Sequence, residues 1–403
     1  MSSVNFLEKL LDGVNVEWRP LSEALNRTKG TKITAAQMRE LHKEGAPIKI
    51  FAGGKTYAFF DFSDIPKKDI NEEPSIIVKS RGFIEFEYYD KPFSHKNEMW
   101  SYNANGKQLD IKFVYYFLKV HEPYFQNIGS KMQMPQISIP DTDNFRIPIP
   151  CPENPKKSLE IQAEIVRILD AMTAHTAELT AELTARKKQY NYYRDKLLSF
   201  EDGEVEWQRL IDACDYVDYR GKTPVKTEKG VFLVTAKNIR MGYIDYAASE
   251  EFVSKEDYSV VMRRGLPKNG DILITTEAPC GFVAQVDREN IALAQRVIKY
   301  RSKNKKLSNN FIKHYLISSH FQNKLMNAAT GSTVKGIKGS KLHQLTIPIP
   351  SEDEQARIVT ILDKFDALTT SITEGLPREI ELRQKQYAYY RDLLLSFPQA
   401  QAA

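Results

Sequence analysis

The chain has few of the residues that build disulfide frameworks or metal sites. Its 403 residues include three cysteines, Cys151, Cys214 and Cys280, which are odd in number and far apart. They form neither a disulfide framework nor a CxxC pair, so we expect reduced thiols. The seven histidines are scattered, and no two have metal-ligand spacing on an expected helix. This pattern argues against a structural metal.

Long apolar runs and a signal-type start are also lacking. Residues 1–13 have no basic start followed by an apolar run, and no stretch approaches the ~20 apolar residues of a membrane span. We therefore expect a cytoplasmic protein with no membrane partner. Apolar residues make up 42% of the chain, which is enough for more than one core and for two to three domains. The net charge of +5 is only weak evidence for nucleic acid, so its distribution matters more.

Sequence signatures of catalysis are missing too. Gly331 and Gly336 have the glycine spacing of a phosphate-binding loop, but Ile337 stands where that loop needs lysine. There is no HExxH and no GxSxG. Asp110-Ile111-Lys112 resembles the carboxylate-x-lysine of a metal nuclease, but it has no upstream Pro-Asp partner, and an aspartate at a helix start favours the positive helix end. We expect no catalytic residue, and no metal ion or cofactor bound by this chain.

The chain does contain a long internal repeat. Near-identical blocks occur about half the chain apart, and the segments between them differ. This arrangement suggests a two-fold scaffold that carries two different domains. The paired blocks are VEW at 16–18 and 205–207, IPIP at 147–150 and 347–350, QAEIVRILD at 162–170 with QARIVTILD at 355–363, and RKKQYNYYRDKLLSF at 186–200 with RQKQYAYYRDLLLSF at 383–397.

The repeated blocks have the apolar spacing of long amphipathic helices. In the first copy, apolar residues in steps of three and four predict a coiled-coil helix over 159–200, about 60 Å long. The second copy starts with a capping box from Ser351 to Glu354, is interrupted at Gly375 and Pro377, and resumes at Ile380. Because both copies carry the same stripe of apolar residues, we expect the two long helices to pack against each other as an antiparallel pair. Simple core packing is the alternative, against which the length of the helix argues.

A tandem Thr-Ala-Glu-Leu repeat lies inside the first helix, at 176–183. All three of Ala, Glu and Leu are strong helix formers, so each unit adds about 6 Å of helix and roughly 40° beyond a full turn. We interpret it as a length adjuster.

The segments between the repeats predict two α/β domains. They resemble each other faintly at 113–118 and 311–316, and at 125–127 and 321–323, so we expect a shared fold with different surfaces. Strands are expected at 48–51, 75–78, 83–88, 231–235, 271–275, 281–286 and 297–301, and helices at 110–120 and 308–327.

The fold class is therefore α/β, with two α/β domains separated by two antiparallel helical repeats in a pseudo-two-fold circular arrangement. The expected boundaries are 1–15 for an amino-terminal segment that completes the distal repeat, 16–146 for the first domain, 147–204 for the central repeat, 205–346 for the second domain and 347–403 for the last repeat.

Basic residues gather in the expected loops of both domains, often beside glycine or a hydroxyl residue. Such loops suit a phosphate backbone or a base edge, although ordinary solvated loops have the same composition. The candidate DNA-binding residues are Lys55, Lys79, Arg81, Lys107, Arg220, Lys222, Lys237, Arg240, Ser332, Thr333, Lys335 and Lys338.

This order of domain, helical repeat, domain and helical repeat resembles the specificity subunit of type I restriction-modification enzymes. The blocks from Arg186 and Arg383, the Thr-Ala-Glu-Leu units and the segment 372–379 are similar to the subgroup called type IC. The resemblance implies two target recognition domains, each reading one half of a bipartite site in double-stranded DNA. It also implies that the helical repeats set the spacer between the half-sites and dock two modification subunits, which methylate adenine. S-adenosylmethionine, ATP and Mg²⁺ would then belong to partner subunits, and whether two restriction subunits join is left open.

Partner docking is expected on the helical repeats, at Tyr193, Arg194, Tyr390 and Arg391, because tyrosine and arginine are common interface anchors. The competing interpretation is that the tyrosines of these blocks, above all Tyr190 and Tyr387, pack the helices together. Two other functions stay open: a DNA-binding regulator that dimerises through its helices, and a methyltransferase or nuclease with an unrecognised active site.

Overall fold

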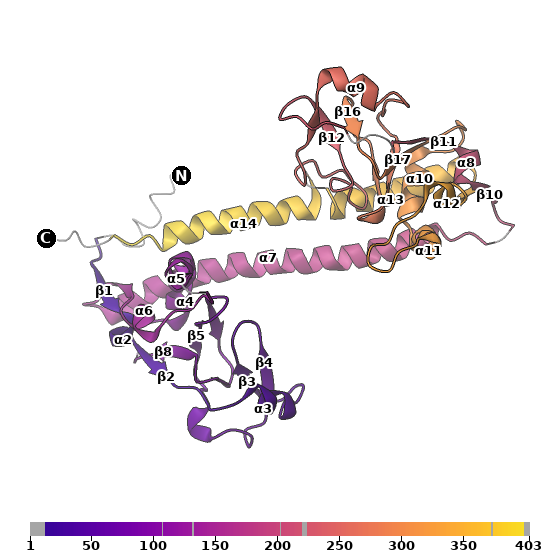
Figure 1. The fold of residues 1–403 in the computed structure, drawn as a ribbon. Helices are drawn as coiled ribbons and strands as arrows, with labels where there is room; N and C mark the ends of the chain where they lie inside the picture. The colour runs from indigo at the N-terminus through magenta and orange to yellow at the C-terminus, as the bar shows by residue number, and fades with distance from the viewer. Residues whose placement is uncertain are drawn as a thin grey trace. The chain divides into compact units, whose positions relative to one another are not determined.

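The computed structural model describes residues 13–106, 108–130, 133–201, 203–219, 224–371 and 374–398. The chain forms two compact units, one of Met1–Ala177 with Leu382–Ala403, and one of Glu178–Glu381. Each unit contains one α/β domain and parts of the long helices (Figure 1). Within the described ranges, no helix is both long and apolar enough to cross a membrane.

The first α/β domain is closed by a two-stranded ribbon that joins its two ends. Strand β1 (Val16–Pro20) pairs antiparallel with β9 (Arg146–Pro150), so Trp18 lies opposite Pro148. An antiparallel sheet has the order β2-β8-β5-β6, and a smaller sheet has the order β4-β3-β7, in which β3 and β7 are parallel. Their bounds are β2 (Leu25–Thr28), β3 (Ile48–Phe51), β4 (Tyr57–Phe60), β5 (Ser75–Lys79), β6 (Glu85–Tyr89), β7 (Phe93–His95) and β8 (Trp100–Ala104).

The second α/β domain repeats this topology strand for strand. Strand β10 (Glu206–Arg209) pairs with β18 (Thr346–Ile349), the larger sheet has the order β11-β17-β14-β15, and the smaller sheet has the order β13-β12-β16, with β12 parallel to β16. The expectation of a shared fold is confirmed. The bounds are β11 (Cys214–Asp218), β12 (Val231–Val234), β13 (Phe252–Val253), β14 (Ile272–Thr276), β15 (Cys280–Gln285), β16 (Ile291–Leu293) and β17 (Val297–Ser302).

Two helices cover the larger sheet of each domain. In the first domain they are α4 (Ile111–Val120) and α5 (Glu122–Gly129), and Asp110 is the N-cap of α4, as its place at a helix start suggested. The single helix expected over 308–327 is instead two helices, α10 (Asn309–Ile317) and α11 (Ser319–Ala328). The reason is that Ser318 has an extended backbone, and its hydroxyl accepts from Phe321 N to start α11. The short helices are α2 (Leu21–Ala24), α3 (Ala35–Glu40), η1 (Lys67–Asp69), α6 (Ile139–Asp143), α8 (Leu210–Ala213), α9 (Lys255–Val261) and α12 (Gly339–Leu342).

The repeated blocks form three long helices, α7 (Pro155–Leu197), α13 (Glu352–Thr369) and α14 (Gly375–Leu394). The break between α13 and α14 begins a few residues before the expected interruption at Gly375 and Pro377, because α13 ends at Thr369. Helix α14 begins at Gly375 with a φ of +79°, and a Cβ there would lie 2.3 Å from Ala367 O. Pro377 falls in the first turn, where its missing N–H is no loss.

The start of α13 has half of the predicted capping box. Ser351 Oγ accepts a hydrogen bond from Glu354 N at 3.3 Å. The Glu354 carboxylate pairs with Arg357 at 2.6 Å and 2.8 Å. The helix start was therefore predicted correctly, with the serine as its cap.

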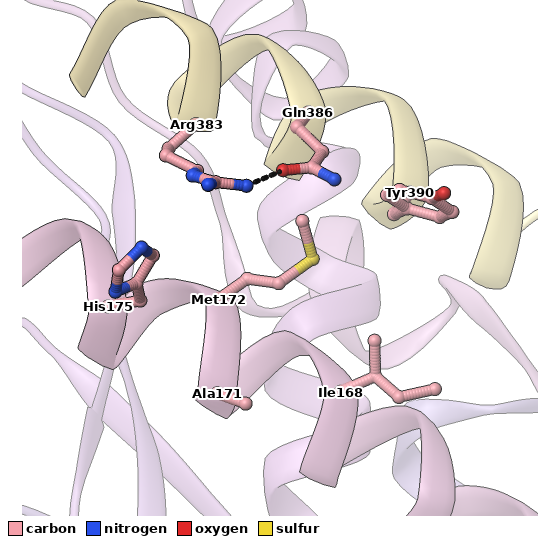
Figure 2. Close-up of a pocket in the computed structure, with 7 residues that line it drawn as sticks. All are labelled: Ile168, Ala171, Met172, His175, Arg383, Gln386 and Tyr390. Carbon is pink, nitrogen blue, oxygen red and sulfur yellow. Dashed lines mark hydrogen bonds between the residues drawn. The ribbon is translucent and has the colours of Figure 1, made fainter. Parts of the chain in front are cut away.

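The long helices pack within each unit. In the unit with the first domain, Ile168, Met172 and His175 of α7 face α14 residues in descending order, from Tyr390 to Arg383, so these helix segments are antiparallel (Figure 2). In the other unit, Tyr190 and Tyr193 of α7 stack on Phe365 of α13, with ring centroids 5.9 Å and 6.0 Å apart.

The last described residues close onto the first domain. Trp18 Nε1 donates to Pro398 O at 3.0 Å, and the ring of Phe397 meets Phe113 edge-on at 5.7 Å. Phe200 meets Phe311 in the same way in the other unit, at 6.5 Å. The contacts of residues 397 and 398 with the first domain agree with the expected circular arrangement, in which the end of the chain returns to its beginning. Residues 1–12, which contain most of the expected amino-terminal segment, lie outside the described residues.

Candidate nucleic-acid interface

A basic cleft of about 750 Å³ lies in the first α/β domain. It is built by the segment that leaves β2, the segment around η1 and the segment before β8. Four cations line the cleft against one carboxylate, Asp69. The cations are Arg27, Lys29, Lys32 and Lys68, and the other lining residues are Thr28, Gly30, Thr31, Pro66, Asn97, Met99, Trp100 and Ile139.

A close backbone contact shapes the loop that carries Lys29 and Lys32. A Cβ on Gly30 would lie 2.2 Å from His95 O and 2.5 Å from His95 Nδ1, so only glycine fits. The next residue, Thr31, donates its backbone N–H to the same His95 O at 2.8 Å. The loop therefore lies directly on the end of β7, and the two lysines extend from a fixed backbone.

Buried polar groups support this loop from below. His95 Nε2 lies 3.2 Å from Ser101 Oγ, its Nδ1 lies 3.1 Å from Lys96 O, and the Ser101 hydroxyl also bonds to Thr28. Burial lowers the pKa of His95, although the Lys96 carbonyl and the Glu98 carboxylate oppose the shift. The imidazole is therefore neutral at neutral pH, with both ring nitrogens hydrogen-bonded.

The cations of the cleft differ in how far they are neutralised. Arg27 pairs with Asp143, whose carboxylate also accepts from the Tyr102 hydroxyl at 2.6 Å. By contrast, no carboxylate among the described residues pairs with Lys29, Lys32 or Lys68, and all three lysines are exposed. Three exposed ammonium groups beside a glycine backbone suit an anionic polymer such as the phosphate chain of DNA.

A second exposed surface is formed by two loops that hydrogen-bond to each other. The turn between β5 and β6 meets the segment before α6, where Gly82 N donates to Pro135 O at 2.9 Å and Ile137 N donates to Ser80 O at 3.0 Å. Arg81, Phe83 and Met134 are exposed on this pair of loops. An aromatic ring beside a guanidinium group can stack on a base as well as bind phosphate.

The second domain has the equivalent pair of loops. Ile337 N donates to Thr276 O at 2.9 Å, and Gly336 exchanges two backbone hydrogen bonds with Thr330. The segment between them forms a closed loop with three of the predicted residues exposed on it, and a fourth lies just beyond it. These exposed residues are Ser332, Thr333, Lys335 and, just beyond the loop, Lys338.

The other predicted DNA-binding residues fall in three groups. Lys55 and Lys237 form the first group and are exposed in loops. Arg240 and Lys79 form the second group, because each is paired with a carboxylate: Arg240 is half-buried and lies 3.4 Å from Asp245. Lys79 is buried, and its ammonium lies 2.6 Å from Glu87 and 3.2 Å from Glu85, which argues against a role in DNA contact. Three predicted residues, Lys107, Arg220 and Lys222, lie outside the described residues.

We did not predict the cleft from the sequence, although one signal was present. Arg27-Thr28-Lys29-Gly30-Thr31-Lys32 leaves β2, and Tyr219-Arg220-Gly221-Lys222-Thr223 follows β11, the equivalent strand. Both segments combine cations, glycine and threonine. We chose the second segment alone, because the equivalence of β2 and β11 is visible only in the strand order.

The predicted docking residues lie on the long helices with different exposures. Tyr190 is buried, as the packing alternative expected, while Tyr193 and Tyr390 are about 39% and 37% exposed. Arg194 pairs with Asp195, and Arg391 pairs with Asp392. The neighbouring tyrosines Tyr192 and Tyr389 are more exposed than the predicted ones, at 61% and 53%.

An apolar groove of about 320 Å³ lies beside Tyr390, between α7 and α14 of the first unit (Figure 2). Its floor is apolar, with Met172 in the centre, and its rim is polar, where Arg383 donates to Gln386 at 2.9 Å. The lining residues are Ile168, Ala171, Met172, His175, Arg383, Gln386 and Tyr390.

One cluster of metal-type ligands lies in the second unit. Ligand atoms of His314, Asp363 and Asp366 lie within 4.8 Å of one another. However, the Lys313 ammonium lies 3.3 Å from Asp363 and 3.1 Å from Asp366, so a cation of the chain already balances both carboxylates. We interpret the cluster as a structural ion network.

Comparison with known proteins identifies the family. A profile described as "Type I restriction modification DNA specificity domain" matches residues 20–187 and 205–382. The chain belongs to the type I restriction-modification specificity subunits. It is 39% identical to the EcoR124I/EcoR124II specificity subunit of Escherichia coli over 99% of this chain and 98% of that one, and 32% identical to the EcoprrI specificity subunit of the same species over 93% of each.

Solved structures of this family agree with the fold. The specificity subunit from M. genitalium covers 96% of this chain and 98% of its own length with a TM-score of 0.57 at 16% identity. A structure described as showing complex assembly of the type I restriction-modification system covers 94% of this chain and 97% of its own length with a TM-score of 0.56 at 15% identity. Specificity subunits are the non-catalytic members of these enzymes; they bind DNA and assemble with other subunits.

Proposed function

We propose that each α/β domain is a target recognition domain that reads one half of a bipartite site in double-stranded DNA. The observation that carries this proposal is the repeated topology with different exposed loops. The first domain carries the basic cleft and the loop pair with Arg81 and Phe83, and the second carries the Gly331–Lys338 loop. Equal scaffolds with unequal loops suit two readers of different sequence.

The cleft and the loop pairs have different tasks in this proposal. The three unneutralised lysines of the cleft bind backbone phosphates, which hold the domain in register on the duplex. The loop residues, such as Arg81 and Thr333, face the base edges. Phosphate contacts give affinity without sequence information, whereas groove contacts give specificity.

The long helices serve two purposes in the proposal: they separate the recognition domains, and they dock two modification subunits. The exposed pairs Tyr192-Tyr193 and Tyr389-Tyr390 occupy equivalent places in the two repeats, which suits two identical partners. The apolar groove beside Tyr390 offers a pocket for a partner side chain. S-adenosylmethionine, ATP and Mg²⁺ belong to the modification subunits and to any restriction subunits that join them.

Adenine methylation sequencing tests the function directly. Cells that express this chain with its modification subunit are compared with cells that lack this chain alone. We expect a new bipartite methylated motif that disappears without the chain. Absence of any chain-dependent motif, with an assembled and active modification subunit, would contradict the proposal and favour a self-dimerising regulator. The packing of α7 on α13 and α14 of the same chain speaks against that alternative, since its helices would pair between chains.

The Thr-Ala-Glu-Leu units give a second test. They lie in the unbroken helix α7, so a third unit inserted after residue 183 adds about 6 Å of helix. We expect the unread spacer of the methylated motif to grow by one or two base pairs, with both half-sites unchanged, because a base pair rises ~3.4 Å. Methylation of the parental spacing alone would refute this role.

A further inference from the structure

The repeated Gln-Ala-x-Ile-Val-x-Ile-Leu-Asp block contains a buried glutamine that holds the adjacent domain. Gln162, in α7, is fully buried. Its Oε1 accepts from Asp110 N at 2.8 Å, and its Nε2 donates to Gln108 O at 3.2 Å and to Ser158 Oγ at 2.9 Å. One amide thus joins the repeat helix to the two backbone groups that precede α4 of the first domain.

The second copy of the block makes the same two contacts to its own domain in the other unit. Gln355, in α13, is 2% exposed. Its Oε1 accepts from Ser308 N at 2.8 Å, and its Nε2 donates to Lys306 O at 3.0 Å and to Pro350 O at 2.8 Å. The bonded groups again lie directly before the matching helix, α10. Two copies that differ in their surrounding sequence have therefore kept the same arrangement of amide and backbone.

The last residue of the block contacts the same helix one turn further on. Asp170 accepts from Lys112 Nζ at 2.7 Å and from Tyr116 OH at 2.5 Å. In the second unit, Asp363 accepts from His314 Nε2 at 2.7 Å and from Lys313 Nζ at 3.3 Å. Glutamine and aspartate lie eight residues apart, about 12 Å along the repeat helix. Two points of attachment at that distance prevent a helix from pivoting about either point.

We propose that the pairs Gln162 with Asp170 and Gln355 with Asp363 are positioning residues that fix the angle of each recognition domain on its own repeat helix. On the domain side the glutamines bond to backbone N–H and C=O groups, which any sequence supplies at a helix start. The clamp therefore holds domains of unlike sequence in one orientation. This inference rests on the proposed function, since the angle of a domain decides where along the duplex it meets its half-site.

The test compares spacer lengths. Full-length Gln162→Ala is expressed with the modification subunit, and methylation is measured on plasmids that carry the two half-sites with the parental spacer or with one base pair more or fewer. We expect the ratio of off-length to parental methylation to rise about tenfold, since losing two buried hydrogen bonds between helix and domain shifts a local equilibrium by roughly that factor. The half-site sequences should not change. Gln355→Ala should have the same effect.

Two further variants separate positioning from folding. Ser158→Ala removes the bond of Gln162 inside α7 and keeps both bonds to the domain, so its spacer ratio should equal that of the wild type. Asp170→Asn changes a half-exposed group and should raise the off-length ratio without loss of folded protein. Equal loss of methylation at all spacers, with an unchanged ratio in every variant, would overturn the proposal and leave Gln162 with a stabilising role only. A wild-type chain that directs no motif would overturn the proposed function itself.

Discussion

The salt dependence of DNA binding tests the cleft most directly. We consider Lys29→Ala combined with Lys32→Ala. Both side chains are exposed in the cleft and pair with no carboxylate of the described residues, so their removal leaves no buried charge behind. If each lysine binds one phosphate, each contributes about 0.9 to the slope of log K against log salt concentration. The double variant should therefore show a slope that is smaller by about 1.8.

This slope predicts a measurable change in affinity. When salt rises fourfold, from about 50 to about 200 mM, the wild type should lose about 12-fold more affinity than the variant. The assay is a fluorescence anisotropy titration of the chain, assembled with its modification subunits, on a duplex that contains the methylated motif. Methylation in cells should weaken at the same motif without a change of its sequence, because phosphate contacts carry little base information.

The matched control removes the same charge elsewhere in the same unit. Lys156→Ala with Lys157→Ala changes two exposed lysines in the first turn of α7. Cations are unfavourable at a helix start, so this control should fold normally and keep the wild-type slope. Equal slopes for the wild type and the Lys29/Lys32 variant would refute phosphate binding by the cleft, even if the affinity itself had fallen.

Two predictions concern Gly30, which shapes the loop of the cleft, and two buried histidines, of which His95 supports that loop. Gly30→Ala should lower the free energy of unfolding by about 2 kcal/mol or more, because the new Cβ would lie 2.2 Å from the backbone oxygen of His95. Gly53→Ala is the control: a Cβ there would have no neighbouring atom within 4 Å, so this variant should be close to neutral in thermal unfolding. Burial lowers the pKa of His95 and of His314, so the unfolded chain takes up protons near pH 6.5 before the folded chain does. The free energy of unfolding should therefore fall as pH drops from 7 towards 5.5. His95→Gln should flatten the dependence of melting temperature on pH in that range, and a melting temperature that is constant from pH 7 to 5.5 in the wild type would contradict this assignment.

Much of the fold was predictable, because periodicity and repetition are local properties of a sequence. The long helix α7 was placed within a few residues at each end. The strands β3, β5, β12 and β17 begin at the first residues of the strands that were expected from apolar runs. The ribbons that close each domain were not predicted, although both of their strands were recognised as repeats. Val16–Trp18 and Ile147–Pro150 are separated by a whole domain, and proline in a strand argues against pairing unless the strand lies at an edge. Their pairing follows from closure of the domain, which no local pattern records.

The candidate site was less predictable, because charge in a sequence does not tell how that charge is neutralised. Lys79 lies beside Ser80 and Arg81 in a segment that reads as a basic loop, yet Lys79 is the last residue of β5, and cross-strand register places it opposite Glu85. Lys29 and Lys68 are far apart in the sequence but line one cleft, and no carboxylate of the described residues pairs with either lysine. A buried ion pair is thus distinguished from a candidate phosphate contact by the neighbours that the fold brings to the lysine, which its local sequence does not show. The same question of neutralisation applies to the second domain, where Arg240 is already paired with Asp245, so the exposed Lys335 and Lys338 are the better candidates for DNA contact there.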